Sequence, residues 1–393
     1  MAIALIGGAL LLAGCFGGDD GGKQQTLVIV GDLSISHPYM GDRATAMAAA
    51  IKAVIRASDG RAGPFVVRYA QSQFGATETQ ESCMPRGERY ARDRRVRAVI
   101  GPDNGACSRF LVPALNRAGM VAISPNDELP GLTHEVPGDY DRTNCLACSP
   151  AEFYPTGARN YVRLIATPDS EGRAAARLLA DLGHRRAFVL DWMPYYMQYG
   201  FVDEAKRVGV RVVKWLHYGD GRSYAVSARS AVASGADAVF LVAPPAQGGM
   251  EVLRALQRVG FSGVIVGSLN LAIGEEASVL RMAGAATAAY FTSNRLPLAA
   301  LSARAREFVT SIGGSEYPAD AVLAADATTG LLKAIATSDG TRAGIREELF
   351  KTTFAGLTGQ VAFDANGDVR PQRIAIYRSR SGRLVYLKTI AVR

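Results

Sequence analysis

The sequence predicts an α/β protein with parallel sheets and two domains. Short apolar runs rich in β-branched residues alternate with longer stretches rich in Ala, Leu and Arg along most of the chain. Continuous apolar runs, in which polar and apolar residues do not alternate, are typical of strands in a parallel sheet covered by helices on both faces. The chain has 393 residues, which is more than one hydrophobic core usually supports, so we expect two domains.

The expected strands follow one another from residue 26 onward. They lie at residues 27–30, 65–67, 96–100, 121–123, 188–190, 210–215, 238–242 and 264–266. After the first run, apolar residues recur at the spacing of one helix face, at positions 47, 50, 51, 54 and 55. Several expected helices end in a glycine just before a strand, at positions 119, 183, 209 and 260. Glycine adopts the left-handed conformation that ends a helix, so this pattern indicates repeated helix-to-strand junctions.

The C-terminal end departs from this alternation. Residues 373–377 and 384–391 have strand composition, and they flank the polar segment 378–383. Two strand-like runs around a short polar segment predict a β-hairpin. We therefore expect an antiparallel addition to a mainly parallel fold.

The N-terminal end predicts export. The apolar run that ends at Cys15 is shorter than the roughly 20 residues that a membrane-spanning helix needs, so residues 1–15 are typical of a signal peptide. Its last residues, Leu-Ala-Gly-Cys, resemble the bacterial lipobox, which implies a lipid on Cys15, although no Lys or Arg precedes the apolar run. An ordinary secretory cleavage site is the alternative. Residues 16–25, rich in Gly and charge, are predicted to be a flexible tether.

The charge distribution does not favour nucleic acid as a partner. The net charge is +8, and the densest basic run covers residues 86–97. Glu88 and Asp93 interrupt this run, and it leads directly into an apolar strand. We therefore interpret it as a solvated helix face and expect no nucleic-acid binding.

Three common motifs of catalysis and cofactor binding are absent from the sequence. It has no GxxxxGK[ST] phosphate loop, no HExxH metal pair and no GxSxG nucleophile motif. The histidines have no His, Cys or carboxylate partner at ligand spacing on a predicted element, so we interpret them as loop or surface residues. They are His37, His134, His184 and His217. We expect neither an enzyme nor a metal or cofactor.

Cys145 and Cys148 form the one motif that suggests redox or metal chemistry. A redox CxxC should open a helix after a strand, whereas this one lies in a loop, 134–160, rich in Pro, Gly, Asp and Asn. A zinc site would need two further ligands nearby. A structural disulfide is our prediction, with redox and metal roles as alternatives. The four cysteines after Cys15 allow three full pairings, and export favours bridges.

Two strand ends give the most specific signal of a family. Residues 99–102, Val-Ile-Gly-Pro, end one strand, and residues 123–125, Ile-Ser-Pro, end the next. Weaker matches occur in a shared order at 30–34, 162–163, 199–200, 354–359 and 363–368. From residue 26 to the C-terminus, this order resembles the branched-chain amino-acid-binding branch of the type I periplasmic binding proteins, which are receptors of ABC importers.

The resemblance implies two Rossmann-like, doubly wound lobes joined by three hinge crossovers, near 161–168, 290–296 and 355–362. Lobe I would comprise residues 26–161 and 292–357, and lobe II residues 162–291 and 358–393. It also implies a monomeric, exported protein that takes up a small solute between the lobes and docks on permease subunits in the membrane. Similar receptors pair two cysteines that correspond to Cys83 and Cys107, which would leave Cys145 with Cys148.

The chain departs from the amino-acid receptors of this family at the expected ligand site. Gly105 and Ala106 stand where serine is common, and Asn126, Asp127 and Glu128 stand where a small residue and threonine are usual. In lobe II, residues 244–247 and 268–270 replace segments that often supply a tyrosine and an acid. Two acids at the site favour a ligand with a cation or hydroxyls. The alternative is that Asp127 or Glu128 only caps a turn.

In a doubly wound sheet the ligand lies at the carboxyl ends of the strands, so we expect the site in the interlobe cleft. The expected ligand-binding residues follow strands: Tyr39, Asn104, Gly105, Asn126, Asp127 and Glu128 from lobe I, and Tyr196, Tyr199, Gln247 and Asn270 from lobe II. The segment 134–160 would border this cleft. One alternative function is a ligand-binding sensor or envelope-assembly subunit of the same fold without a transporter. An α/β hydrolase or nucleotide-dependent enzyme is the alternative from another class.

Overall fold

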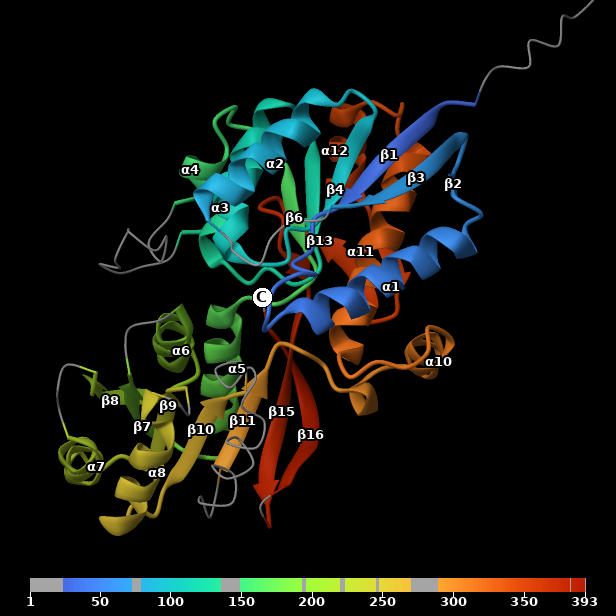
Figure 1. Cartoon of the computed structure of the whole chain (residues 1–393). Helices are drawn as coiled ribbons and strands as arrows, with labels where there is room; N and C mark the ends of the chain where they lie inside the picture. The colour runs from blue at the N-terminus through green and yellow to red at the C-terminus, as the bar shows by residue number, and fades with distance from the viewer. Residues whose placement is uncertain are drawn as a thin grey trace, which may run out of the picture.

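The computed structural model of the chain has two lobes, one above the other in Figure 1, and each is built around its own β-sheet. The central strands of both sheets are parallel, which confirms the predicted α/β class with two parallel-sheet lobes. The structure describes residues 24–72, 79–135, 149–192, 196–219, 223–244, 247–269, 289–381 and 383–392.

The first lobe contains a six-stranded sheet with the order β2-β3-β1-β4-β5-β6. Its strands are β1 (Thr26–Gly31), β2 (Arg61–Ala62), β3 (Phe65–Gln71), β4 (Val96–Ile100), β5 (Val121–Ser124) and β6 (Tyr161–Arg163). Its longer helices are α1 (Gly41–Ala57), α2 (Gln80–Arg92), α3 (Gly105–Arg117), α10 (Ala303–Ser311), α11 (Pro318–Thr337) and α12 (Arg342–Lys351). Short helical turns are η1 (Pro130–Leu132), α4 (Pro150–Phe153) and η5 (Leu298–Ala300).

Apolar side chains cover both faces of this sheet. Leu27 and Ile29 of β1 pack with α1, α11 and α12, whereas Val30 packs on the opposite face with α2 and α3. Successive side chains of a strand point to opposite faces, so a strand between two helix layers must be apolar throughout. This packing explains the continuous apolar runs of the sequence.

The second lobe contains a seven-stranded sheet with the order β16-β15-β11-β10-β9-β7-β8. Its strands are β7 (Arg186–Asp191), β8 (Arg211–His217), β9 (Ala238–Val242), β10 (Val264–Ser268), β11 (Ala289–Ser293), β15 (Gln372–Arg380) and β16 (Arg383–Val392). Its helices are α5 (Pro168–Asp181), α6 (Tyr196–Arg207), α7 (Tyr224–Ala233) and α8 (Gly249–Arg258). The predicted C-terminal hairpin is confirmed, because β15 and β16 pair antiparallel.

The predicted helix ends are also confirmed. The four glycines expected at helix-to-strand junctions have positive φ angles, from 64° at Gly119 to 85° at Gly183. In the part of the chain that the structure describes, no helix is both long and apolar enough to cross a membrane.

The chain passes between the lobes three times, at residues 164–167, at 294–297 and next to Pro371. The third passage lies later than the expected 355–362. That segment belongs to a small sheet made of β12 (Phe354–Gly356), β13 (Gly359–Phe363) and β14 (Val369–Arg370). Val361, Phe363 and Val369 pack into the first-lobe core, so the first lobe extends beyond residue 357.

Candidate functional site

Three loops of the first lobe meet at the carboxyl edge of its sheet. After β1, Ser34 donates from its backbone N–H and its hydroxyl to the carboxylate of Asp103, at 3.0 and 2.6 Å. After β4, Asn104 Nδ2 donates to Ser34 Oγ at 2.8 Å. The hydroxyl of Ser124, at the end of β5, donates to the carbonyl of Pro102 at 2.6 Å. The loops therefore form one hydrogen-bonded unit.

Asn104 and Gly105 begin helix α3 at this edge. Asn104 is the N-cap, and its side-chain oxygen accepts from the backbone N–H of Cys107 at 3.1 Å. A Cβ atom on Gly105 would lie 2.9 Å from Cβ of Leu129 and 3.4 Å from Asp127 Oδ1. Glycine thus permits the loop after β5 to approach the helix closely, which is a physical reason for the missing serine at this position.

Asp127 is fully buried in the loop after β5. Ser108 donates its hydroxyl to Asp127 Oδ2, and the backbone N–H of Leu129 donates to Oδ1 at 2.9 Å. Burial raises the pKa of Asp127. Because both carboxylate oxygens bind groups of the protein, Asp127 has the geometry of the turn cap that the sequence analysis kept as the alternative.

Asn126 and Glu128 both bind Arg295. Arg295 Nη1 lies 2.8 Å from Glu128 Oε1, and Nη2 donates to Asn126 Oδ1 at 2.6 Å. Arg295 Nε also donates to Asp320 of α11 at 3.3 Å. Burial disfavours the charged guanidinium, but the charges of Glu128 and Asp320 outweigh it and raise the pKa of Arg295. The Glu128 side chain keeps 21% of its surface exposed, so it is open to a solute.

Glu171 places a second glutamate at the facing edge of lobe II. It lies in the first turn of α5, is fully buried, and accepts from Ser268 and Thr292 at 2.9 Å each. Burial, and then the negative charge of Glu128, raises the pKa of Glu171 to about 7. The carboxylate of Glu128 in lobe I therefore acts electrostatically on Glu171 of lobe II.

The lobe II residues that the sequence predicts for the site have different surroundings. Tyr196 is buried at the start of α6, and the charge of Asp127 adds to burial in raising its pKa, so it lies near the first-lobe loops. The ring of Tyr199 packs edge-on against Trp215, with 5.1 Å between centroids. Gln247 is exposed, and its backbone carbonyl accepts from the Tyr218 hydroxyl at 2.6 Å.

The structure describes only some of the remaining residues that the sequence analysis predicts to be functional. Tyr39 of lobe I is 85% exposed, and its ring contacts that of His37. Asn270 lies outside the described residues, and so do the cysteines Cys15, Cys145 and Cys148. Of the ten expected ligand residues, the structure therefore brings together Asn104, Gly105, Asn126, Asp127, Glu128 and Tyr196.

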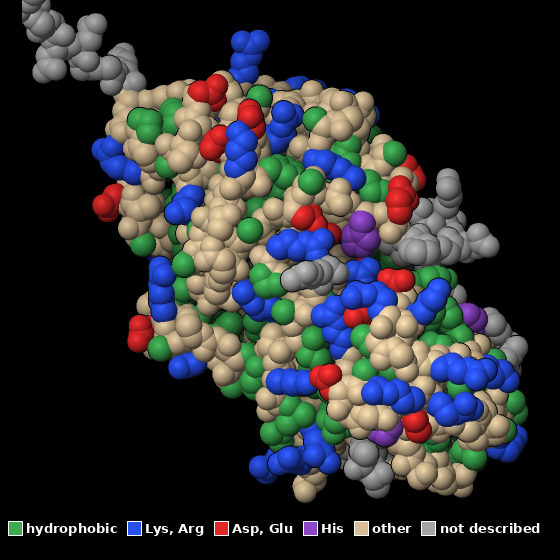
Figure 2. Space-filling view, turned by 180° about the vertical axis from the view of Figure 1, so that it is seen from behind, with side chains coloured by type: hydrophobic (Ala, Val, Ile, Leu, Met, Phe, Trp, Pro, Cys, Tyr) green, Lys and Arg blue, Asp and Glu red, His purple; other side chains and the backbone are tan. Residues whose placement is uncertain are grey.

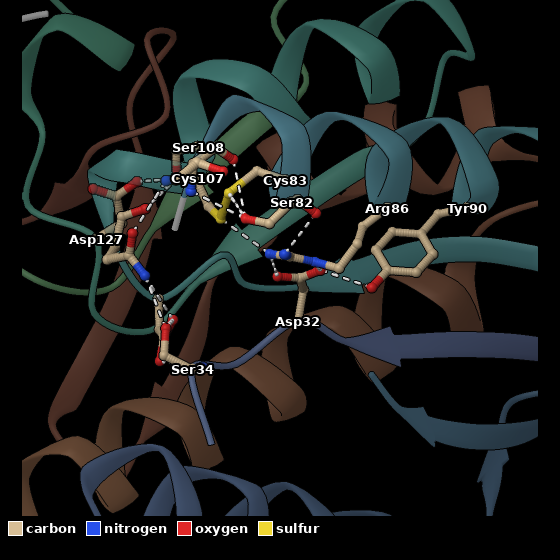
Figure 3. Close-up of a disulfide and its surroundings, with 12 residues drawn as sticks. Asp32, Ser34, Ser82, Cys83, Arg86, Tyr90, Cys107, Ser108 and Asp127 are labelled. Carbon is tan, nitrogen blue, oxygen red and sulfur yellow. Dashed lines mark hydrogen bonds and ion pairs between the residues drawn. A yellow bond between two sulfur atoms is a disulfide. The ribbon is translucent and has the colours of Figure 1, made fainter. Parts of the chain in front are cut away.

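The predicted disulfide between Cys83 and Cys107 is confirmed (Figure 3). It joins α2 to the first turn of α3. Beside it, Arg86 forms two hydrogen bonds to Asp32, at 3.0 and 3.1 Å, and donates to Cys107 Sγ at 3.0 Å. The loop after β1 and the start of α3 are therefore held by the same covalent and ionic contacts.

Most of the other charged side chains in the basic run that contains Arg86 face solvent. Arg92 and Arg95 have 74% and 78% of their side-chain surface exposed, and they pair with Glu88 and Asp93. Figure 2 shows Lys and Arg over both lobes, with Asp and Glu between them. These observations agree with a solvated helix face.

Sequence analysis missed Arg295 and Glu171. Arg295 lies just after the carboxyl end of β11. Residues 289–293 were not expected to form a strand, so the rule that ligand residues follow strand ends did not point to it. Glu171 has no local signal, because its partners Ser268 and Thr292 are 97 and 121 residues away. Among the described residues, no three His, Cys, Asp or Glu side chains are grouped so that they could hold a metal ion.

Solved structures with the same fold come from several bacteria. An ABC transporter substrate-binding protein of Desulfitobacterium hafniense, solved in complex with Leu, is 19% identical with a TM-score of 0.67, covering 92% of this chain and 99% of that one. A leucine-binding protein of Thermotoga maritima is 20% identical with a TM-score of 0.65, covering 93% and 98%. A solute-binding protein of R. palustris in complex with 4-hydroxybenzoate is 14% identical with a TM-score of 0.67, covering 93% and 97%.

The curated proteins include no significant match to the chain. The model of one protein family, described as periplasmic binding protein, matches residues 86–383. This match spans well over half of the sequence and includes strands, helices and crossovers of both lobes. The chain therefore belongs to the periplasmic binding protein family.

Proposed function

We propose that the chain is the exported solute-binding protein of an ABC importer and that it binds a small polar solute between its lobes. The proposal rests on two glutamates: Glu128 of the first lobe, which pairs with Arg295, and Glu171 of the second lobe, whose pKa the negative charge of Glu128 helps to raise. The solved proteins of the same fold that are named as ABC transporter substrate-binding proteins support it. A lipid on Cys15 would hold the protein at a membrane, where it would meet permease subunits. The fold serves binding here, and we assign no catalytic step to it.

The charges around Arg295 favour a solute that carries a cation or hydroxyl groups. Glu128, Glu171 and Asp320 surround this arginine, and Arg43 lies 3.6 Å from Asp320. An ammonium group beside Glu128 would be attracted by the carboxyl groups of Glu128 and Glu171, whereas an anion there would be attracted only by Arg295, which already pairs with Glu128 and Asp320. Amino acids, their amides and polyamines combine such a group with the small size that an interlobe site requires.

A thermal-shift screen of amino acids, amides, polyamines and sugars tests the proposal. A solute that binds only the native state raises the melting temperature. We expect cationic or hydroxyl-bearing solutes to raise it and simple anions to leave it unchanged. A screen in which no small polar solute stabilises the protein would contradict the proposed function.

The exchange Glu128→Gln then tests the site with the solute that the screen identifies. A charge-assisted hydrogen bond contributes about 1.5–3 kcal/mol, so calorimetry should show roughly tenfold to hundredfold weaker binding. Glu251→Gln is the matched control, because Glu251 is a half-exposed acid on α8. Unchanged affinity in both Glu128→Gln and Asp127→Asn would show that neither acid contacts the solute and would direct the search to neutral or anionic solutes.

A further inference from the structure

His134 joins the two lobes outside the proposed solute site. It follows η1 in the first lobe, and its Nδ1 atom lies 3.2 Å from Oδ2 of Asp368. Its Nε2 atom lies 3.4 Å from Oδ2 of Asp169. Asp368 directly precedes β14 of the small sheet that packs on lobe I, whereas Asp169 is in the first turn of α5, the first helix of lobe II. The imidazole ring therefore spans the lobe boundary.

Both acids are buried and fixed by further charges. Asp368 accepts from Nε of the fully buried Arg163 at 2.7 Å, and Asp169 pairs with Arg173 at 3.1 Å. The result is a continuous series of alternating charges that runs from β6 of lobe I to α5 of lobe II.

This series also reaches the proposed solute site. Arg163 Nη1 donates to the backbone carbonyls of Asp127 and Leu129, at 3.2 and 2.8 Å. These carbonyls flank Glu128, which is the acid expected to meet the solute. The position of His134 is thus linked, through Asp368 and Arg163, to the loop that carries Glu128.

The charges that surround His134 favour its cationic form. Asp169 and Arg173 face it from α5, and Asp368 and Arg163 from the hinge side of lobe I. Glu135 and Arg159 line the same surface hollow of about 540 Å³, and the His134 side chain keeps 26% of its surface exposed. Burial alone would lower the pKa of His134, but its contacts with Asp169 and Asp368, and their negative charges, raise it to about 9.

We propose that His134 is a positioning residue that clasps lobe II to lobe I through Asp169, and that releasing this contact lets the lobes rotate relative to each other. A hinge movement about the three crossovers separates His134 from Asp169, while the contact between His134 and Asp368 stays within lobe I. Below pH 9 the cationic ring attracts both acids. Above pH 9 the neutral ring has one N–H to donate, so it no longer compensates both negative charges.

Distances between spin labels on the two lobes test this clasp without any added solute. Labels attached to keto amino acids at positions 92 of α2 and 254 of α8 leave the native cysteines intact, and both side chains are well exposed. In the full chain we expect one narrow distance distribution at pH 7. It should shift and broaden as pH rises, with a midpoint near the pKa of about 9.

Variants separate the clasp from general effects of alkaline pH. His134→Gln and Asp169→Asn should each show the broad distribution already at pH 7 and lose the pH-dependent shift. His184→Gln is the matched control, since His184 pairs with Asp237 at 3.6 Å within lobe II, and it should behave like the wild type.

Two results would overturn the proposal. One is a wild-type distribution that does not change between pH 7 and pH 10. The other is a His134→Gln distribution identical to that of the wild type at both values. Because no solute is present, either result leaves the proposed function untouched, and a failed solute screen leaves the clasp untouched.

Discussion

Glu171 links the interlobe region to the stability of the protein. Its pKa is raised from 4.5 to about 7, so between these values the folded state holds a proton that the unfolded state releases. The contribution of Glu171 to the free energy of unfolding is therefore greatest below pH 4.5 and falls as pH rises to 7. Glu171→Gln should remove this fall and stabilise the protein at pH 8 by on the order of 3 kcal/mol.

Urea unfolding at pH 4.5 and pH 8 measures this difference. Gln keeps an oxygen that can accept from Ser268 and Thr292, so the comparison isolates the charge. Glu251→Gln, on an exposed helix face, should show no such gain. If Glu171→Gln is less stable than the wild type at pH 8, the carboxylate is favourable in the fold and our assignment of its ionisation is wrong.

The positions of single residues could be predicted better than their contacts. Asn104, Asn126 and Glu128 follow strands, and the rule that ligand sites lie at the carboxyl ends of strands placed them together. The orientation of Asp127 depends on Ser108, 19 residues earlier, and no local pattern contains that information. The same reason explains why Glu171, with partners from β10 and β11, was missed.

The start of α3 is the element on which the first-lobe part of the site depends. The disulfide that ties it to α2 closes a loop between positions separated by 24 residues. A crosslink across a loop of this size stabilises the native state by about 3 kcal/mol. Replacing Cys83 and Cys107 by Ala should lower the free energy of unfolding by about this amount and weaken solute binding, because Asn104 and Gly105 lose their anchor.

Urea unfolding of the double variant provides the measurement, and the reduced wild-type protein provides an independent comparison. Equal stability of the oxidised wild type and the double variant would show that Arg86 and Asp32 alone fix α3.

Elements with a strong repeating pattern were predictable, and short ones were not. The parallel strands and the C-terminal hairpin follow from apolar runs of several residues. Strands β12 and β14 have three and two residues, too few to show a period. The segment 355–362, which covers most of β12 and β13, was expected to be a crossover. The packing of Phe354 of β12 and Val369 of β14 into the first-lobe core assigns both strands to lobe I.

The proposed attachment of the whole molecule to a membrane depends on a lipid at Cys15. Stable attachment to a membrane needs more than one acyl chain, which a lipid-modified N-terminal cysteine would supply. With a functional export signal, Cys15→Ser should move the mature protein from the membrane fraction to the soluble fraction. Fractionation followed by immunoblotting measures this change. A wild-type protein that is equally soluble would contradict lipid anchoring and leave the solute site unaffected.

The two-lobed architecture was predictable because length, strand order and motif order agree with it. The exact place of the third crossover was not, since it depends on which core the residues after 357 join. Packing between segments far apart in the sequence determines which core these residues join. One such contact is the approach of Phe354 of β12 to Gly330 of α11.

The central claim is that a small polar solute binds between the lobes at Glu128. A crystal structure with the solute that most raises the melting temperature tests this claim most directly. We predict that the solute lies between the carboxyl ends of the two sheets, with a cationic or hydroxyl group on Glu128. A solute bound on the outer surface of one lobe, or one that presents an anionic group to Glu128, would contradict the account.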